Sequence, residues 1–129
     1  MDLETTGLSH QDDEIIELAM LPFDYDSESC EIHQVYNQQA FSKLREPSRS
    51  IPESITQING ITNEMVEGHK IEAEEVEEIV KECVFIIAHN AGFDRPMLEN
   101  LFRCFEDKTW SCSVNGCLLY TSDAADERL

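Results

Sequence analysis

The sequence has few basic residues. It contains 9 Lys and Arg against 27 Asp and Glu among 129 residues, a formal net charge of −18. Such a surface repels nucleic acid at long range and releases few counterions on a duplex. This disfavours a protein that coats DNA. It still allows a protein that holds a few nucleotides through metal ions, because bound divalent cations invert the local charge.

Paired cysteines and long apolar runs are also missing. The five cysteines contain no Cys-x-x-Cys pair, which disfavours a zinc site, and their number is odd. Free thiols in a reducing cytoplasm are the expected state, so we expect a cytoplasmic location. No apolar run approaches the length needed to cross a bilayer, and we expect no membrane association.

The chain is long enough for one domain with a modest core. It has no internal repeat and no low-complexity linker. Residues 14–23 are nearly all apolar, as in a strand covered on both faces. A polar turn separates them from a second extended stretch at 30–41, so the two are predicted to form a hairpin.

The rest of the chain alternates predicted helices with short strands. A capping box at 50–53 should open a helix that ends at Asn59-Gly60, and Thr62 should cap another. Apolar spacing predicts helices over 72–83 and 92–105, the second with Pro96 early enough to be tolerated. Short strands are expected at 84–88 and 110–113. This order of elements predicts an α/β fold.

Acidic residues lie next to two of the predicted apolar strands. Asp2 and Glu4 are two apart, so on a strand their side chains share one side. Asp94 stands where the 84–88 strand passes into a helix. Carboxylates grouped in this way hold hard cations such as Mg²⁺ or Mn²⁺. The alternative is that these acids are solvated surface residues.

Two segments together resemble the motifs of a known enzyme family. Asp2-Leu3-Glu4-Thr5-Thr6-Gly7 and Asn90-Ala91-Gly92-Phe93-Asp94 resemble the first two motifs of the DnaQ-like (DEDD) 3′–5′ exonucleases, which include the proofreading epsilon subunit of bacterial DNA polymerase III. The resemblance implies an RNase H-like fold with a central mixed sheet flanked by helices. It also implies metal-dependent hydrolysis at the 3′ end of single-stranded or frayed DNA, and a replicative polymerase as a partner.

The resemblance assigns roles to the acidic residues. It implies a site for two Mg²⁺ or Mn²⁺ ions about 3.5–4 Å apart. Asp2 would bridge both ions, Glu4 would serve the ion that activates water, and Asp94 would serve the other.

The resemblance also implies which residues contact the substrate. Gly7 and the two threonines would let backbone N–H groups approach the terminal nucleotide. Ile61 would wedge against the terminal base and Phe93 would pack on the opposite side, although ordinary core packing is an alternative for both. The expected substrate-binding residues are Thr5, Thr6, Gly7, Ile61, Asn90 and Phe93.

The third motif of the resembled family, His-x4-Asp, is absent after Asp94. Its His would be the general base and its Asp a further metal ligand. We therefore expect residues 1–116 to be a partial exonuclease domain, cut at both ends and impaired in catalysis. Residues 117–129 resemble a translated sequencing-library adapter and are expected to be a non-native tail.

Two other functions stay open at this point. The chain could be a non-catalytic nucleic-acid-binding or interaction module, since the general base is missing. It could also belong to an RNA-trimming exoribonuclease of the same superfamily, because discrimination of the 2′-hydroxyl depends on details of the pocket.

Overall fold

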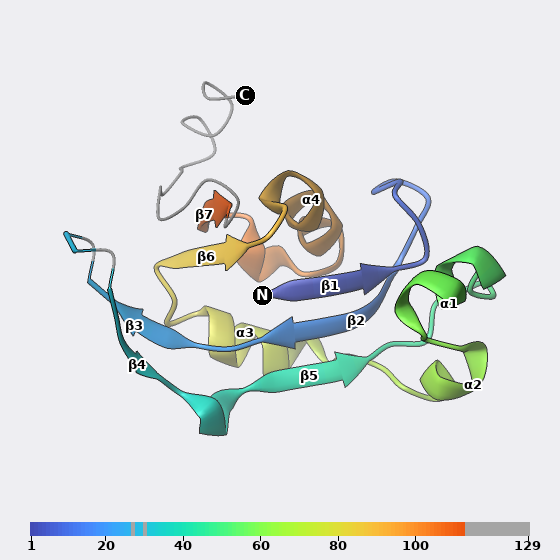
Figure 1. Ribbon diagram of the computed structural model, residues 1–129, viewed down its shortest axis with the longest axis horizontal. Coiled ribbons are helices and arrows are strands. Elements are labelled where there is room, and N and C mark those ends of the chain that lie inside the picture. Colours follow the sequence, from blue (N-terminus) through green and yellow to red (C-terminus); the bar gives the residue numbers. More distant parts are fainter. Residues whose placement is uncertain (27, 30, 113–129) are drawn as a thin grey trace.

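The computed structural model describes residues 1–26, 28–29 and 31–112. The predicted tail, residues 117–129, lies outside the described residues. Along the described chain, a group of strands comes first, a group of helices follows, and a strand–helix–strand unit comes last, which confirms the predicted α/β class. Figure 1 shows the strands side by side, with helices on both sides of them.

The sheet that carries the first motif is antiparallel. Its strands β1 (Asp2–Thr5), β2 (Ile15–Met20) and β5 (Phe41–Leu44) follow the order β1-β2-β5. All but two β2 residues are buried, as the nearly continuous apolar run predicted. Placed in the middle, β2 fixes the positions of both neighbouring strands.

A parallel pair of strands lies beside β1. The strands β6 (Phe85–Ala88) and β7 (Thr109–Cys112) pair in parallel. In Figure 1, β6 runs next to β1 in the same direction, and the Met1 amino group donates to the Ile87 carbonyl at 2.7 Å. Parallel and antiparallel strands therefore stand side by side, with β1 and β6 as neighbours.

The predicted strand at 14–23 is two strands, because Pro22 interrupts it. Proline has no backbone N–H, so the ladder breaks after Met20. After Pro22 the chain continues into β3 (Phe23–Tyr25), which pairs with β4 (Ile32–Val35) as a separate hairpin. The hairpin is confirmed, but its first strand is only three residues long.

The predicted extended stretch at 30–41 is also interrupted. After β4 the chain forms a 3₁₀ turn, η1 (Asn37–Gln39), and only then enters β5. Because η1 separates them, β4 and β5 belong to different sheets. The sequence pattern did not predict β5, because its four residues, Phe-Ser-Lys-Leu, do not alternate between polar and apolar.

Two short helices follow β5. The first, α1 (Glu53–Asn59), ends at Gly60, whose φ of 78° lies in the left-handed region that glycine favours. The second, α2 (Asn63–Val66), is capped by the Thr62 side chain, which accepts from the Met65 N–H. The end of α1 at Gly60 and the start of α2 at Thr62 were both predicted. The capping box was wrong: the N-cap is Pro52, which has no side-chain oxygen.

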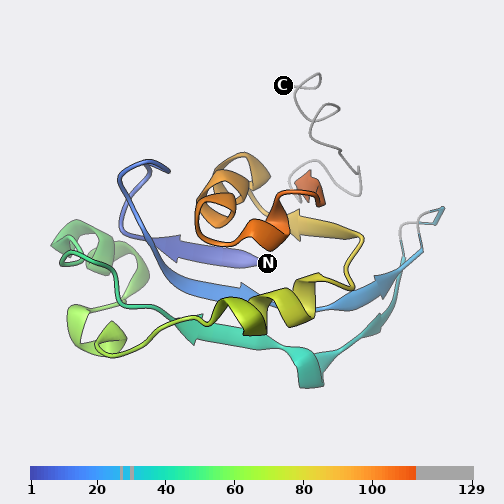
Figure 2. The same ribbon diagram turned by 180° about the vertical axis from the view of Figure 1, so that it is seen from behind.

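Helix α3 (Ala73–Val80) covers one face of the antiparallel sheet. It passes behind β2 in Figure 1 and in front of the strands in Figure 2. Val76 and Val80 on its inner side are buried against the core residues Leu18 and Met20 of β2. The glutamates of the helix are exposed, as the predicted solvated face requires.

Helix α4 (Ala91–Leu101) follows β6 directly and includes Pro96 in its first turns. It buries Met97 and Leu98, whereas Leu101 is 39% exposed. The predicted continuation to 105 was wrong, because the chain leaves the helix at Phe102 and forms η2 (Arg103–Phe105). Because the chain turns at Phe102, the side chains of Phe102 and Phe105 both pack in the main core.

A main core and a smaller cluster hold these layers together. The smaller cluster contains Ile16, Ile51, Ile61 and Val66, and it anchors α1 and α2 to the end of β2. Among the helices that the structure describes, none is long and apolar enough to cross a membrane. The Cys83, Cys104 and Cys112 thiols are free, as expected.

Candidate active site

The first two carboxylates come from β1. Asp2 and Glu4 occupy alternate positions, and the side chain of Leu3 between them is buried in the core. Side chains alternate along a strand, so the two acids share the face opposite to Leu3. Their common orientation, predicted from the sequence, follows from the regular extended conformation of β1.

The third carboxylate comes from the first turn of α4. Asp94 is only 7% exposed, and its pKa is raised to about 6, first by burial and then by the negative charge of Asp2. Glu4 acts in the same direction, while the Met1 ammonium and His89 oppose the shift. These couplings make Asp2, Glu4 and Asp94 electrostatic neighbours, although Asp94 is about ninety positions away in the sequence.

The donor set fits a hard divalent cation by its chemistry. All three groups are carboxylates, and a cation would offset both the burial of the Asp94 charge and its repulsion by Asp2, the two largest causes of its raised pKa. Within the described ranges, no three His, Cys, Asp or Glu side chains stand close enough to form a metal site as they are.

Glu17 is a fourth acid on the same face, and it was not among the residues predicted from the sequence. It lies on β2 directly opposite Glu4, and opposed residues of an antiparallel pair project to the same side. Its pKa is raised by burial, then by Glu4 and Asp2. The available signal was a single acid inside an otherwise apolar strand, which is unusual for a buried position.

The Thr-Thr-Gly segment, which begins with the last residue of β1, is hydrogen-bonded within the loop that follows. The Thr6 hydroxyl donates to Asp13 at 3.0 Å and accepts from the Glu14 N–H, and the Thr5 hydroxyl donates to the Gly7 carbonyl at 2.6 Å. These bonds close the loop between β1 and β2. Both hydroxyls therefore fix the backbone at the end of β1.

Gly7 is required by the position of Asp13. A Cβ atom at position 7 would lie 2.7 Å from the carboxyl carbon of Asp13 and 2.8 Å from one of its oxygens. That carboxylate cannot move freely, because Thr6 and the Ser9 N–H hold it. The glycine therefore allows the acid to close the loop beside the site.

Gly7→Ala should destabilise the protein by about 1–3 kcal/mol, because Asp13 must give up hydrogen bonds to make room. Gly92→Ala is the matched control. Its added Cβ would meet only an Asn90 oxygen at 3.7 Å, an ordinary contact. Chemical unfolding measures both variants. Equal stability of the two variants would show that the loop accommodates the methyl group.

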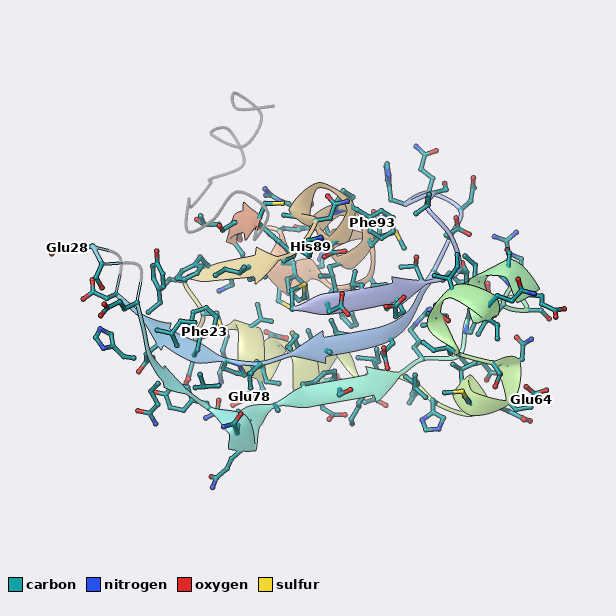
Figure 3. All side chains as sticks on the ribbon, in the orientation of Figure 1. Phe23, Glu28, Glu64, Glu78, His89 and Phe93 are labelled. Atoms are coloured by element: carbon teal, nitrogen blue, oxygen red, sulfur yellow. The ribbon has the colours of Figure 1, made fainter. Side chains whose placement is uncertain are left out.

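The residues of the second motif lie around the start of α4. Asn90 is the N-cap residue and is exposed, and its side chain makes no capping hydrogen bond. Phe93 is partly buried and packs against the main core. Figure 3 labels His89, which follows the end of β6, and Phe93 on α4, both above β1. Because Phe93 is neither fully buried nor fully exposed, its position is compatible with core packing and with contact to the terminal nucleotide.

The position of Ile61 favours core packing over a base contact. Its side chain is 4% exposed and belongs to the small cluster with Ile16, Ile51 and Val66. The neighbouring Ile58, in the last turn of α1, is 81% exposed. Ile58 and Ile61 stand on either side of Asn59-Gly60, and the sequence does not show which of the two isoleucines is buried.

The basic cluster after the hairpin is engaged with the protein's own acids. Lys43 pairs with Glu75 at 2.6 Å, Arg45 pairs with Glu14 at 3.2 Å, and the Arg49 side chain donates to the Asp12 carbonyl. In the described structure these side chains are therefore already committed to intramolecular partners.

Comparison with protein families gives one clear match. The RNase_T family, described as an exonuclease, matches residues 1–121, which includes the start of the predicted tail. A DNA polymerase III PolC-type from Mycoplasma genitalium is 34% identical over 110 residues, covering 83% of this chain and 7% of the relative. A DNA polymerase III PolC-type from Staphylococcus aureus is 32% identical over 123 residues, which cover 91% of this chain and 8% of the relative. The chain thus spans less than a tenth of these relatives.

A solved structure shares the architecture. Exonuclease X in complex with 5′ overhanging duplex DNA superposes with a TM-score of 0.61 at 26% sequence identity. The match covers 98% of this chain and 69% of that one. It therefore extends over the whole arrangement of strands and helices and not only over the carboxylate site.

Proposed function

The chain belongs to the RNase_T exonuclease family and has its RNase H-like fold, and from this premise we propose that it is a metal-dependent 3′–5′ exonuclease domain. The proposed substrate is the 3′ end of single-stranded or frayed DNA. The observation that carries the proposal is the placement of Asp2 and Glu4 on one face of β1, with the buried Asp94 of α4 near enough for the Asp2 charge to raise its pKa. Two carboxylates on β1 and one on α4 supply oxygen ligands from two sides.

The proposed cofactors are two Mg²⁺ or Mn²⁺ ions held by Asp2, Glu4 and Asp94. When bound, such ions lower the pKa of water and stabilise negative charge on the leaving 3′ oxygen. The buried position of Asp94 limits access of bulk water to that carboxylate. Leu3 and the core below it keep β1 in place, so both of its acids stay aimed at the same region.

The proposed substrate contacts surround the carboxylates. The Thr6 N–H already donates to the Glu14 carbonyl at 2.9 Å, so in the loop at Thr5, Thr6 and Gly7 the proposed backbone donor to the terminal nucleotide is Gly7. Asn90 offers an exposed amide, and Phe93 offers a ring at the start of α4. Ile58 replaces Ile61 as the candidate for apolar contact with the terminal base, because only Ile58 is exposed.

A polymerase partner is also a proposal. The relatives named DNA polymerase III PolC-type are far longer than this chain, which covers 7–8% of them. We infer that the domain removes nucleotides from a 3′ end supplied by a polymerase active site. The strongly acidic surface agrees with this, since it gives little affinity of its own for duplex DNA.

Incubation with Mn²⁺ and a 5′-labelled single-stranded oligonucleotide should give slow shortening, one nucleotide at a time, from the 3′ end. Asp2→Ala should abolish it, because that carboxylate is a proposed ligand of both ions. Asp107→Ala, at an exposed position after η2, is the matched control and should leave the rate unchanged.

Other outcomes of this assay separate the alternatives. Phosphorothioate linkages at the 3′ end should block the reaction, and blockage by the same linkages at the 5′ end would reverse the proposed polarity. Cleavage of RNA but not DNA would retain the mechanism and change the substrate. DNA binding without cleavage under any divalent cation would favour the binding-module function.

A further inference from the structure

Asn59, the last residue of α1, joins the turn after that helix to the carboxylate site. Its side-chain amide nitrogen donates to Glu4 Oε2 at 3.4 Å. Its side-chain oxygen accepts from the Ile61 N–H at 2.9 Å. The two ends of one amide therefore have different partners, one in the site and one in the turn.

The turn that carries Asn59 is fixed from several sides. Gly60 takes a left-handed conformation, and its N–H donates to the Thr56 carbonyl at 2.7 Å. The Thr56 hydroxyl donates to the Ile61 carbonyl at 2.6 Å. Ile61 itself is buried in the small apolar cluster. With its backbone held in this way, Asn59 has little freedom to turn its amide away from Glu4.

Glu4 needs an orienting donor because its other neighbours are acidic. Glu17 faces it across the β1–β2 pair, and Asp2 lies two positions away on the same face. Like charges favour rotation of the carboxylate away from the site, toward solvent. Among the hydrogen bonds of the described residues, the Glu4 carboxylate receives one side-chain donor, the Asn59 amide.

We propose that Asn59 is a positioning residue that restrains rotation of the Glu4 carboxylate on the site face of β1 and so favours binding of a divalent cation. The proposal rests on the proposed function, in which Glu4 is a metal ligand. Donors to a metal-ligating group fix its orientation, and their removal typically weakens metal affinity by about 10–100-fold. The Asn59 bond is long, so an effect of about tenfold is expected.

The test measures the dissociation constant for Mn²⁺ by calorimetric titration, together with the melting temperature. Asn59→Ala should bind Mn²⁺ about tenfold more weakly. Asn59→Gln, which keeps the amide on a longer stem, should restore part of the affinity. Thr56→Val is the matched control, because it removes a hydrogen bond of the same turn without touching Glu4. It should lower the melting temperature and leave Mn²⁺ affinity unchanged.

Two results would overturn the positioning role of Asn59 and leave the proposed function intact. Wild-type affinity in Asn59→Ala would show that Glu4 needs no orienting amide, and equal weakening in Thr56→Val would assign the effect to the stability of the turn. Asp2→Ala, measured in parallel, separates these results from failure of the proposed function. Unchanged affinity in that variant would remove the metal site itself, and the role of Asn59 with it.

Discussion

Replacing Asp94 by Asn should stabilise the metal-free protein at neutral pH by up to about 3 kcal/mol, because the shift of its pKa from 3.8 to about 6 measures the cost of the buried charge. The first cause of that shift is burial, followed by repulsion from Asp2. An uncharged amide of nearly the same shape avoids both. The favourable interactions of Asp94 with His89 and the Met1 ammonium oppose the shift and are already included in the pKa of about 6.

The stabilisation by Asp94→Asn should increase as the pH rises. Between pH 4 and 6 the folded protein keeps the Asp94 proton while the unfolded chain has released it, so wild-type stability falls as pH rises through this window. Below pH 4 both states are protonated and the penalty vanishes; above pH 6 it is complete. The stability difference between Asp94→Asn and wild type should therefore grow from pH 4 to pH 6 and then level off.

Urea unfolding of both proteins across this pH range checks the prediction, with Asp107→Asn as an exposed control. Mn²⁺ provides a second comparison, because a ligand that binds only the folded state stabilises it by mass action. Mn²⁺ should raise the melting temperature of wild type more than that of Asp94→Asn. A less stable Asp94→Asn at pH 7.5 would show that the charged carboxylate is compensated in the folded protein.

Supplying the missing third motif should raise the rate of DNA hydrolysis by about 10²–10⁴-fold, the usual contribution of a positioned general base. No His follows His89 in the sequence, so the chain has no His-x4-Asp after its second motif. The extension to use is the segment that follows the matched region in the Staphylococcus aureus relative. It would continue the chain from β7, which lies beside β6 and the start of α4.

Single-turnover release of mononucleotides from a 3′-labelled oligonucleotide measures the gain, with Mg²⁺ present in excess. The extended protein with its new His replaced by Ala is the control, and it should lose most of the increase. Asp2→Ala or Asp94→Ala in the extended protein should abolish release. An extended protein that binds DNA and never cleaves it would refute the exonuclease proposal.

Much of the local structure was predictable from short-range patterns. The apolar run of β2, the turn at Gly60, the Thr62 cap and the buried side of α3 all depend on interactions within a few residues. Where the pattern failed, one residue or a distant contact changed the outcome. Pro22 divided a single apolar run into β2 and β3, and packing of Phe102 and Phe105 against the core ended α4 early.

In the candidate site too, some features follow from local sequence patterns and others only from tertiary contacts. The sequence alone determined that Asp2 and Glu4 share a face, because alternation is a property of any strand, and that Asp94 begins a helix after a buried strand. Only the tertiary structure decided that Asp94 enters the field of Asp2, that Glu17 faces Glu4, and that Ile61 is buried while Ile58 is exposed. Strand register, burial and the donation from Asn59 to Glu4 join residues far apart in the chain, and no local pattern specifies such pairings.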